Sequence, residues 1–400
     1  MRDKRIGRRD FMKTTLAGCG GLFMLSSEAK GQETRVVDSK GKERKFVYRT
    51  LGRTGLKLPV INMGVMNSDN PNLIRAALDS GLVLLDTAHG YMGGRNEETI
   101  GRVIKGRPRD SFMIGSKVSL PKDRSTGLYL EGATTEEFLK KLDISLKRLG
   151  VDHVEILYHH GVSNKESVVY EPVLKAMEKA KKEGKIRFAG ISTHMNEPEV
   201  VHATVDSKFY DVILVAYNYQ QKHYPEVRNA IARAAEAGIG IVGMKAILGR
   251  RQSPAAQNAA AALKWVLQDS NVHTIVPGFT AFEELETDLA VLENPSLTED
   301  EKKTLQKEAS LASLYCQGCR QCLKQCRDQL PVPDLMRAYM YTYGYRNLAL
   351  AQDLLLSLNL PSRACEDCSQ CSVKCSVGFN VSAKIKDVAR LKDVPTEFIA

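Results

Sequence analysis

Eight of the nine cysteines in this sequence lie in two short runs that share one spacing. Residues 316–326 and residues 365–375 both follow the pattern CxxCxxCxxxC. Thiolate sulfur binds soft metal ions and iron–sulfur clusters, so a repeated cysteine pattern indicates a metal or cluster site. The ninth cysteine, Cys19, lies near the N-terminus and belongs to neither run.

The spacing of the two runs resembles that of bacterial ferredoxins, which hold two 4Fe–4S clusters. In that arrangement the first three cysteines of a run bind one cluster and the fourth cysteine binds the other. The proline that usually follows the fourth cysteine is absent, and Arg327 and Ser376 take its place. The pattern predicts one cluster on Cys316, Cys319, Cys322 and Cys375, and a second cluster on Cys326, Cys365, Cys368 and Cys371.

Zinc binding, disulfide formation and simple packing are the alternatives to iron–sulfur clusters at these cysteines. Tetrahedral zinc can bind pairs of CxxC thiols, although each run holds one thiol more than a paired zinc site needs. Disulfides are compatible with an exported protein, but cysteines three residues apart on a tight turn bridge poorly. Cysteines buried only for packing would not repeat at so regular an interval.

Four further side chains are of the types that reduce or form a carbonyl group. An acid, a phenol, an amine and an imidazole occur at or just after the ends of apolar runs, at Asp86, Tyr91, Lys117 and His160. A tyrosine hydroxyl can donate a proton to a carbonyl oxygen that accepts hydride. A neighbouring ammonium is expected to lower the pKa of the tyrosine, and a carboxylate would hold that ammonium in place. The imidazole would position the substrate oxygen.

These residues are positioned by an alternation of apolar runs and amphipathic stretches. Parallel strands joined by helical crossovers produce such an alternation. Eight units favour a closed (β/α)8 TIM barrel, in which the reacting groups lie at the C-terminal ends of the strands. The fold class is therefore α/β, and the predicted strands are 59–64, 82–86, 111–117, 153–159, 186–192, 211–216, 239–244 and 272–277.

The rest of the chain divides around this barrel. Residues 46–58 alternate apolar and polar side chains around a glycine turn, as a hairpin that closes the barrel floor would. The polar segment 293–303 separates a barrel at 46–292 from a C-terminal domain at 305–392. The segment between the cysteine runs has a helical pattern, so the C-terminal domain is predicted to be a helix-rich, ferredoxin-like iron–sulfur domain.

The barrel segment resembles the aldo-keto reductase family, some members of which carry C-terminal cluster modules. The family's catalytic tetrad would fall on Asp86, Tyr91, Lys117 and His160, and by register His160 matches better than His159. The segments "LGRTGLKL" and "TIVPGFTAFEEL" are also similar to the family. Members bind a nicotinamide dinucleotide across the same rim, and the resemblance implies that it is held here by Ser192, Tyr217, Asn218, Lys245, Pro277 and Gly278.

Several of the family's nucleotide contacts are missing from this sequence. Thr193 and Leu214 stand where an asparagine and a glutamine are expected. The Lys, Arg and Asn that usually surround a 2′-phosphate are replaced by Gly278, Glu284 and Asp288. Because two acids would repel a phosphate, the sequence predicts NAD rather than NADP.

Residues 1–33 are predicted to be a twin-arginine export signal. Arg8 and Arg9 precede a short, weakly apolar run. The segment "LAGC" also fits a lipoprotein cleavage box, which would make Cys19 a lipid attachment site. The predicted location is periplasmic or otherwise extracytoplasmic, and an ordinary basic N-terminus is the alternative.

The formal net charge of +10 is concentrated at the start of the chain. Residues 1–50 hold 13 basic and 6 acidic side chains, a net of +7, which leaves +3 for the other 350 residues. Without a basic stripe interleaved with aromatic residues, the sequence predicts no nucleic-acid partner. No internal run reaches the roughly 20 apolar residues that span a bilayer, so an integral membrane enzyme is not predicted either.

The sequence therefore predicts an exported oxidoreductase that interconverts an alcohol and a carbonyl. Its substrate would be a small polar compound such as a sugar, and two 4Fe–4S clusters would relay electrons to or from a redox partner protein. The alternative is an iron–sulfur electron-transfer or partner-docking protein built on a barrel that has lost nucleotide binding.

Overall fold

A computed structural model describes most of the chain after residue 30. The described residues are 31–37, 41, 43–123, 126–247, 258–310, 316–358, 360, 364–366, 368 and 371–399. The two arginines of the predicted export signal and Cys19 lie outside the described residues.

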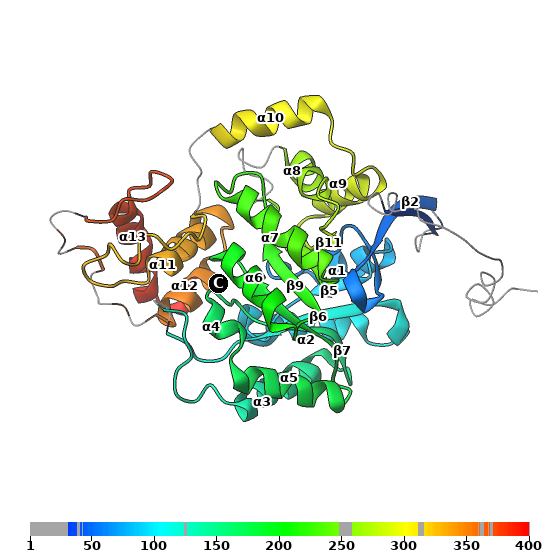
Figure 1. Ribbon diagram of the computed structural model, residues 1–400, viewed down its shortest axis with the longest axis horizontal. Helices are drawn as coiled ribbons and strands as arrows, with labels where there is room; N and C mark the ends of the chain where they lie inside the picture. The colour runs from blue at the N-terminus through cyan, green and yellow to red at the C-terminus, as the bar shows by residue number, and fades with distance from the viewer. Residues whose placement is uncertain are drawn as a thin grey trace, which may run out of the picture. The chain divides into compact units, whose positions relative to one another are not determined.

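An eight-stranded parallel sheet forms the centre of the protein, with the strand order β11-β10-β9-β8-β7-β6-β5-β4 (Figure 1). The two end strands meet, because parallel bridges join Ile61 to Ile275 and Gly64 to Gly278. Gly64 N also donates to Pro277 O at 2.9 Å. The sheet therefore fits the predicted (β/α)8 barrel, with strands β4 (Met63–Gly64), β5 (Leu84–Asp86), β6 (Met113–Val118), β7 (Val154–His159), β8 (Ile186–Thr193), β9 (Val212–Ala216), β10 (Gly240–Met244) and β11 (Thr274–Ile275).

A helix follows every strand of the barrel and covers its outer face (Figure 1). The outer residues of the strands and the inner faces of the helices share one large apolar core. The helices are α1 (Pro71–Asp79), α2 (Arg95–Ile104), α3 (Thr135–Leu149), α4 (Lys165–Val168), α5 (Glu171–Lys182), α6 (Glu197–Ser207), α7 (Tyr224–Glu236), α8 (Ala259–Leu267) and α9 (Phe282–Glu293).

Helix α3 shows how the sequence sets these elements. The Thr134 side chain caps its N-terminus by accepting from Glu137 N at 3.2 Å, and Gly150 ends it with a φ of 67°. Both are common helix-end signals. The buried side chains recur at helical spacing, which directs one face toward the sheet; they are Phe138, Leu142, Ser145, Leu146 and Leu149.

A short antiparallel sheet closes the floor of the barrel, as the sequence predicts. Leu51 and Leu58 pack into the barrel interior with Val212 and Leu214. A Cβ on Gly52, whose φ is 48°, would lie 2.5 Å from Gly238 O, so only glycine fits this close approach. The strands are β1 (Gln32–Val37), β2 (Glu43–Thr50) and β3 (Lys57–Pro59).

The C-terminal segment forms a helical layer with an apolar core of its own. Helices α11, α12 and α13 lie side by side (Figure 1), and partly buried cysteines pack against their core. Helix α10 (Glu299–Ser310) connects the barrel to this segment. The other helices are α11 (Val332–Tyr339), the π-helical turn η6 (Met340–Gly344), α12 (Leu348–Leu356) and α13 (Val381–Ala389), followed by the 3-10 turns Arg390–Asp393 and Thr396–Phe398.

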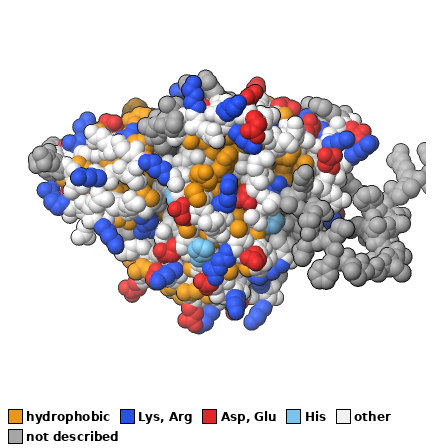
Figure 2. Space-filling model, turned by 45° about the horizontal axis from the view of Figure 1, so that its top comes forward, with side chains coloured by type: hydrophobic (Ala, Val, Ile, Leu, Met, Phe, Trp, Pro, Cys, Tyr) orange, Lys and Arg blue, Asp and Glu red, His pale blue; other side chains and the backbone are white. Residues whose placement is uncertain are grey.

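The outer surface is of mixed charge. Lys and Arg side chains are interspersed with Asp and Glu on the face seen in Figure 2. In the part of the chain that the structure describes, no helix is long and apolar enough to cross a membrane.

Candidate functional site

Asp86 and Lys117 form a buried ion pair at the C-terminal ends of two neighbouring strands. Lys117 Nζ lies 2.5 Å from Asp86 Oδ1 and 2.6 Å from the carbonyl oxygen of Thr87. The parallel pairing of β5 with β6, in which Asp86 faces Gly115, brings the two side chains to the same end of the barrel. The pair is 6% and 1% exposed, so little water screens it.

Tyr91 and His160 complete this group at the rim. Tyr91 begins a 3-10 turn after β5, and its ring centroid lies 5.0 Å from Lys117 Nζ. The ring of His160, which follows β7, is 6.0 Å away at an interplanar angle of 80°. The structure thus brings together the four side chains that the sequence assigns to catalysis.

Burial dominates the electrostatics of the four groups. It raises the pKa of Asp86 and lowers the pKa of Lys117, and the mutual attraction of the pair opposes both shifts. Burial and the Asp86 carboxylate raise the pKa of Tyr91 well above its usual value. Burial, followed by the charge of Lys117, lowers the pKa of His160 well below its usual value. At neutral pH the phenol is therefore protonated and the imidazole uncharged.

The raised pKa of Tyr91 differs from the expectation that the ammonium would lower it. The ammonium is paired with the carboxylate of Asp86, whose negative charge itself raises the pKa of the phenol. Desolvation then decides the direction of the shift, because the charged form of a buried phenol is disfavoured.

His159, the neighbour of His160, points to the other side of β7. Its Nδ1 lies 3.0 Å from Tyr210 Oη, and its Nε2 contacts Tyr129 Oη. Both tyrosines belong to the layer between sheet and helices. His159 therefore lies in the helical layer, as register predicts, and only His160 is available at the rim.

Some of the residues predicted to hold the nicotinamide nucleotide lie at the rim. Lys245, Pro277 and Gly278 line a cavity of about 100 Å³ together with Asp86 and Tyr91. Lys245 also lines a second cavity, of about 60 Å³, with Asn218. Ser192 lies near the same end of the barrel, where its Oγ accepts from Gly161 N at 2.9 Å.

Tyr217 is not brought to the rim, contrary to its predicted role in holding the nucleotide. It is fully buried, its Oη accepts from Arg228 Nε at 2.9 Å, and its ring lies 5.1 Å from that of Trp265. The reason is the alternation along β9: Val212 and Leu214 point into the barrel, so odd-numbered positions point outward.

The two acids that are predicted to favour NAD over NADP are buried. Glu284 and Asp288, in α9, are 8% and 0% exposed. Glu284 Oε2 accepts from Thr280 N at 2.6 Å. A side-chain carboxylate therefore already binds a backbone N–H just before the N-terminus of α9, where a phosphate would otherwise find donors.

Tyr345 is a site residue that the sequence did not reveal. It follows the π-helical turn of the C-terminal segment and lines the same cavity as Tyr91 and Lys245. Its Oη accepts from Lys245 Nζ at 3.2 Å. The tyrosine-rich stretch 339–345 was the only local signal, and it does not indicate contact with the barrel.

The first set of cysteines combines three residues of the first run with Cys375 of the second run. Burial raises the pKa of Cys316 to about 11, and the nearby thiols of Cys319 and Cys375 add to this rise. Burial raises the pKa of Cys322 to about 12, again with contributions from the other three. Cys319 Sγ also lies 3.3 Å from Oγ of Ser376, the residue after Cys375.

This first set lies against the barrel rim. Gly318, with a φ of 69°, approaches so closely that a Cβ would meet His194 O at 2.8 Å. Gln317 Nε2 donates to Gln220 O at 2.6 Å. Cys316 lines the same cavity as Lys245.

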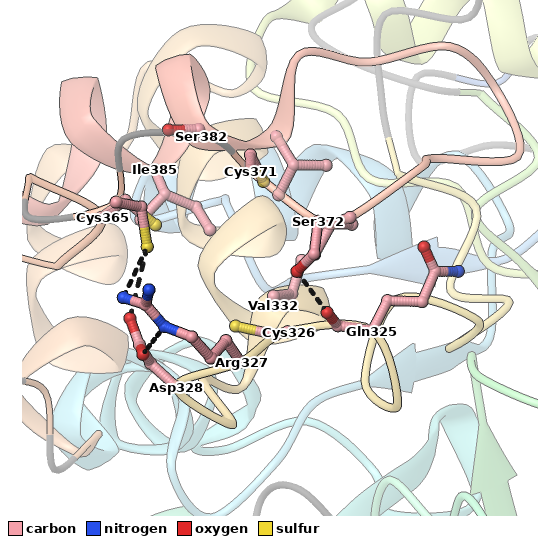
Figure 3. A pocket seen from close by; sticks show the side chains of 13 residues that line it. Gln325, Cys326, Arg327, Asp328, Val332, Cys365, Cys371, Ser372, Ser382 and Ile385 are labelled. Atoms are coloured by element: carbon pink, nitrogen blue, oxygen red, sulfur yellow. Dashed lines mark hydrogen bonds and ion pairs between the residues drawn. The ribbon is translucent and has the colours of Figure 1, made fainter.

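The second set surrounds a cavity of about 340 Å³ (Figure 3). Burial raises the pKa of Cys365 to about 11, with further contributions from Cys326, Cys368 and Cys371. Cys368 Sγ lies 3.4 Å from Asp328 Oδ2. The four thiols that line the cavity are those of Cys326, Cys365, Cys368 and Cys371.

Neither set forms a site for one metal ion. Among the described residues, no three His, Cys, Asp or Glu side chains come together closely enough to hold a single ion. A tetrahedral zinc site, which needs four ligands around one ion, therefore has no support in this part of the chain.

Part of the barrel matches a known protein family. Residues 62–253 match the family model described as Aldo/keto reductase family. L-glyceraldehyde 3-phosphate reductase of Escherichia coli (strain K12) is 31% identical over 163 residues, which cover 38% of this chain and 46% of that protein. L-galactose dehydrogenase of Arabidopsis thaliana is 32% identical over 164 residues, which cover 37% and 49%. The matches thus span about half the length of these relatives.

Solved structures support the same fold. Aldo-keto reductase AKR11C1 from Bacillus halodurans, in its holo form, superposes with a TM-score of 0.56 at 23% identity. That match covers 68% of this chain and 99% of the other. The thermostable aldo-keto reductase Tm1743 superposes with a TM-score of 0.52 at 25% identity, covering 66% and 99%.

Proposed function

We propose that this protein is an oxidoreductase that interconverts an alcohol and a carbonyl at Tyr91, because residues 62–253 match the model of the aldo/keto reductase family. One observation carries the proposal. Tyr91, the Lys117–Asp86 ion pair and His160 lie together at the C-terminal ends of the barrel strands. Reacting groups of such barrels lie at this end.

Tyr91 acts as the proton donor when a carbonyl is reduced. Burial keeps its hydroxyl protonated, and the hydroxyl gives its proton to the substrate oxygen as negative charge develops there. The ammonium of Lys117 then stabilises the phenolate, while Asp86 holds that ammonium in place. In the oxidation of an alcohol the same groups work in reverse, with the phenolate accepting the proton.

His160 positions the substrate. Because its imidazole is uncharged, one ring nitrogen carries a proton that can be donated to the substrate oxygen. A neutral donor beside Tyr91 orients the oxygen without competing as the acid.

The nucleotide that fits this barrel is NAD(H), which supplies or accepts the hydride when bound. Glu284 and Asp288 repel a 2′-phosphate, whereas an acid suits the free 2′-hydroxyl of NAD. NADP is therefore the poorer fit. The residues positioned to hold a nicotinamide nucleotide at the rim are Ser192, Asn218, Lys245, Pro277 and Gly278.

The C-terminal segment is proposed to hold two 4Fe–4S clusters. The described cysteines gather into two sets that each combine three thiols of one run with the fourth of the other. A cavity of about 340 Å³ between four thiols suits a multi-atom cluster better than one ion. When bound, such clusters transfer electrons one at a time.

The position of the first set supports a relay between the clusters and the barrel. Cys316 and Lys245 line one cavity, and Lys245 also lines the cavity beside Tyr91. In the second set, Cys371 is exposed to solvent, where a partner can approach. Electrons from the rim would pass through the first cluster and then the second to a redox partner protein.

An extracytoplasmic location remains part of the proposal. Its support is the twin-arginine sequence at Arg8 and Arg9, with Cys19 as a candidate lipid anchor. This route exports folded proteins, which suits a protein whose clusters are inserted before export.

A second function is favoured by one observation, the loss of Tyr217 from the rim. Together with Thr193 and Leu214, it leaves a nicotinamide ring few of its usual contacts. On this alternative, the barrel no longer binds nucleotide and the protein serves as an electron-transfer or partner-docking subunit.

Metal analysis and EPR of the protein purified without oxygen test the cluster proposal. Two clusters give about eight iron atoms per chain, and Cys371→Ser is expected to lower this to about four. Ser372→Ala, which alters the same cavity without removing a thiol, should leave the iron content unchanged. Zinc in place of iron, or an iron-free protein, would contradict the proposal.

A further inference from the structure

Two cationic side chains at the barrel mouth have only uncharged hydrogen-bond partners among the described residues. Lys245 Nζ donates to Tyr345 Oη at 3.2 Å. Arg337, in α11, donates from Nη1 to His194 Nε2 at 2.5 Å, and burial keeps that histidine neutral by lowering its pKa. Lys245 and Arg337 line the same cavity.

Two carboxylates that line these cavities have other partners. Asp86 is paired with Lys117 at 2.5 Å. Glu197, which lines the cavity, lies 3.0 Å from His223 and accepts from Gln221. Neither Asp86 nor Glu197 is therefore an ion-pair partner of Lys245 or Arg337 in the described part of the chain.

The two cations act on the catalytic residues. Lys245 lines the cavity that contains Tyr91 and Asp86. The guanidinium of Arg337 is close enough to oppose the rise in the pKa of Tyr91 and to contribute to the lowered pKa of His160. Lys245 is also held at a φ of 57°, a backbone conformation that is costly for lysine and often found at functional sites.

We propose that Arg337 and Lys245 bind an anionic group of the substrate, a carboxylate or a phosphate, while Tyr91 and His160 bind its carbonyl or alcohol oxygen. The inference rests on the proposed oxidoreductase function and narrows its substrates to small acidic carbonyl and hydroxy compounds. A guanidinium binds such oxyanions through two parallel hydrogen bonds, which fixes orientation as well as adding affinity. Cavities of about 60 and 100 Å³ suit a small compound.

Two other anions compete for these cations. One is the pyrophosphate of a dinucleotide, and the other is the first cluster, since the charge of Arg337 also acts on Cys316. The substrate is favoured because Lys245 lines both the cavity of Arg337 and the cavity that contains Tyr91 and Asp86. Of the residues proposed to hold the nucleotide, Pro277 and Gly278 line the other cavity, whereas Asn218 and Lys245 line the cavity of Arg337, so binding of NADH is measured as well.

Titration calorimetry on the full chain, purified without oxygen, tests the inference with three probes. Hydroxyacetone is neutral, whereas pyruvate is an anionic compound of similar size and hydroxyacetone phosphate is a larger anion. The wild type is expected to bind at least one of the anions about tenfold or more tightly than hydroxyacetone. Arg337→Gln should remove this preference and leave the affinity for hydroxyacetone unchanged.

Three variants serve as controls. Arg337→Lys keeps the charge and should restore part of the preference. Lys245→Met should weaken anion binding as Arg337→Gln does. Lys384→Met removes a cation from the same C-terminal segment, where Lys384 lies over the Tyr339 ring at 4.0 Å, and should have no effect.

Several results would overturn the inference. Equal affinity of the wild type for neutral and anionic probes would do so, as would an anion preference that survives Arg337→Gln. A loss of NADH affinity in Arg337→Gln equal to the loss for the anions would assign the site to the nucleotide. A change confined to the EPR spectrum would assign Arg337 to the cluster. If the protein binds the anions but turns over none of the probes, the result contradicts the oxidoreductase proposal and still supports the anion site.

Discussion

The barrel rim has two halves that differ in how far their side chains converge. From β5 to β7, Asp86, Tyr91, Lys117 and His160 gather around one ion pair. From β8 to β11, the residues predicted to hold a nucleotide are divided among separate tasks. Tyr217 packs against Trp265, and Ser192 Oγ accepts from Gly161 N.

The C-terminal segment contacts the second half more directly than the first. Tyr345 bonds to Lys245, Gln317 bonds to Gln220, and Cys316 lines a cavity with Lys245. The half that is complete holds the residues proposed to transfer the proton. The half that lacks several of the expected nucleotide contacts adjoins the cysteines, so the electron carrier is the feature in which this protein is expected to differ from the aldo-keto reductases that it resembles.

Replacing Tyr91 by phenylalanine should have the largest effect and tests the complete half of the rim. Removing the proton donor is expected to lower kcat by about 10²–10⁴-fold, because general acid catalysis is worth about that much. The fold should be unchanged, since the ion pair of Lys117 with Asp86 does not involve the phenol. Steady-state rates with a dye acceptor measure the effect, and a variant with undiminished turnover would favour the electron-transfer alternative.

The sequence predicted the barrel and the complete half of the rim because both depend on local pattern. Each of the eight predicted strands overlaps an observed one, and Asp86 and Lys117 meet because parallel pairing aligns strand ends. The sequence did not predict to which face of the sheet the Tyr217 side chain points. Every residue of β9 is buried, so the strand shows no alternation of polar and apolar residues. Tyr345 was missed because its contact with Lys245 joins distant segments.

Acidification should weaken the fold through His159, which lies just behind the complete half of the rim. Burial lowers the pKa of His159 to about 3, whereas the unfolded chain titrates near 6.5. Above about pH 6.5 the buried, neutral imidazole does not destabilise the folded state. As the pH falls from about 6.5 toward 3 the folded state loses stability, because only the unfolded state gains the proton. Between pH 8 and pH 5 the loss should be about 2 kcal/mol.

Urea unfolding of the cluster-containing protein at both pH values measures this loss. His159→Gln should reduce the difference between the two pH values by about that amount, whatever it does to stability at pH 8. A pH dependence that is the same in His159→Gln as in the wild type would contradict the assignment.

Glu284→Gln probes the incomplete half of the rim. The wild type is expected to bind NADH more tightly than NADPH, because the buried carboxylate repels a 2′-phosphate. Removing that charge should raise the affinity for NADPH about tenfold and change the affinity for NADH little. Fluorescence titration measures both constants, and Glu283→Gln, an exposed neighbour in the first turn of α9, is the control. A wild type that prefers NADPH would contradict the charge argument.

Tyr158→Phe should have the smallest effect and gives the sharpest contrast with Tyr91→Phe, because Lys117 faces both rings. Its ammonium lies 5.8 Å from the Tyr158 ring, inside the barrel, and 5.0 Å from the Tyr91 ring at the rim. The Tyr158 hydroxyl is buried and has no hydrogen-bond partner among the described residues. Its removal should therefore change the free energy of unfolding by less than about 0.5 kcal/mol, or raise it slightly. Turnover should stay within about threefold of the wild type, since proton transfer belongs to the rim phenol alone. A loss of activity comparable to that of Tyr91→Phe would show that the inner hydroxyl helps hold Asp86 and Lys117, and that the complete half of the rim extends one layer deeper into the barrel.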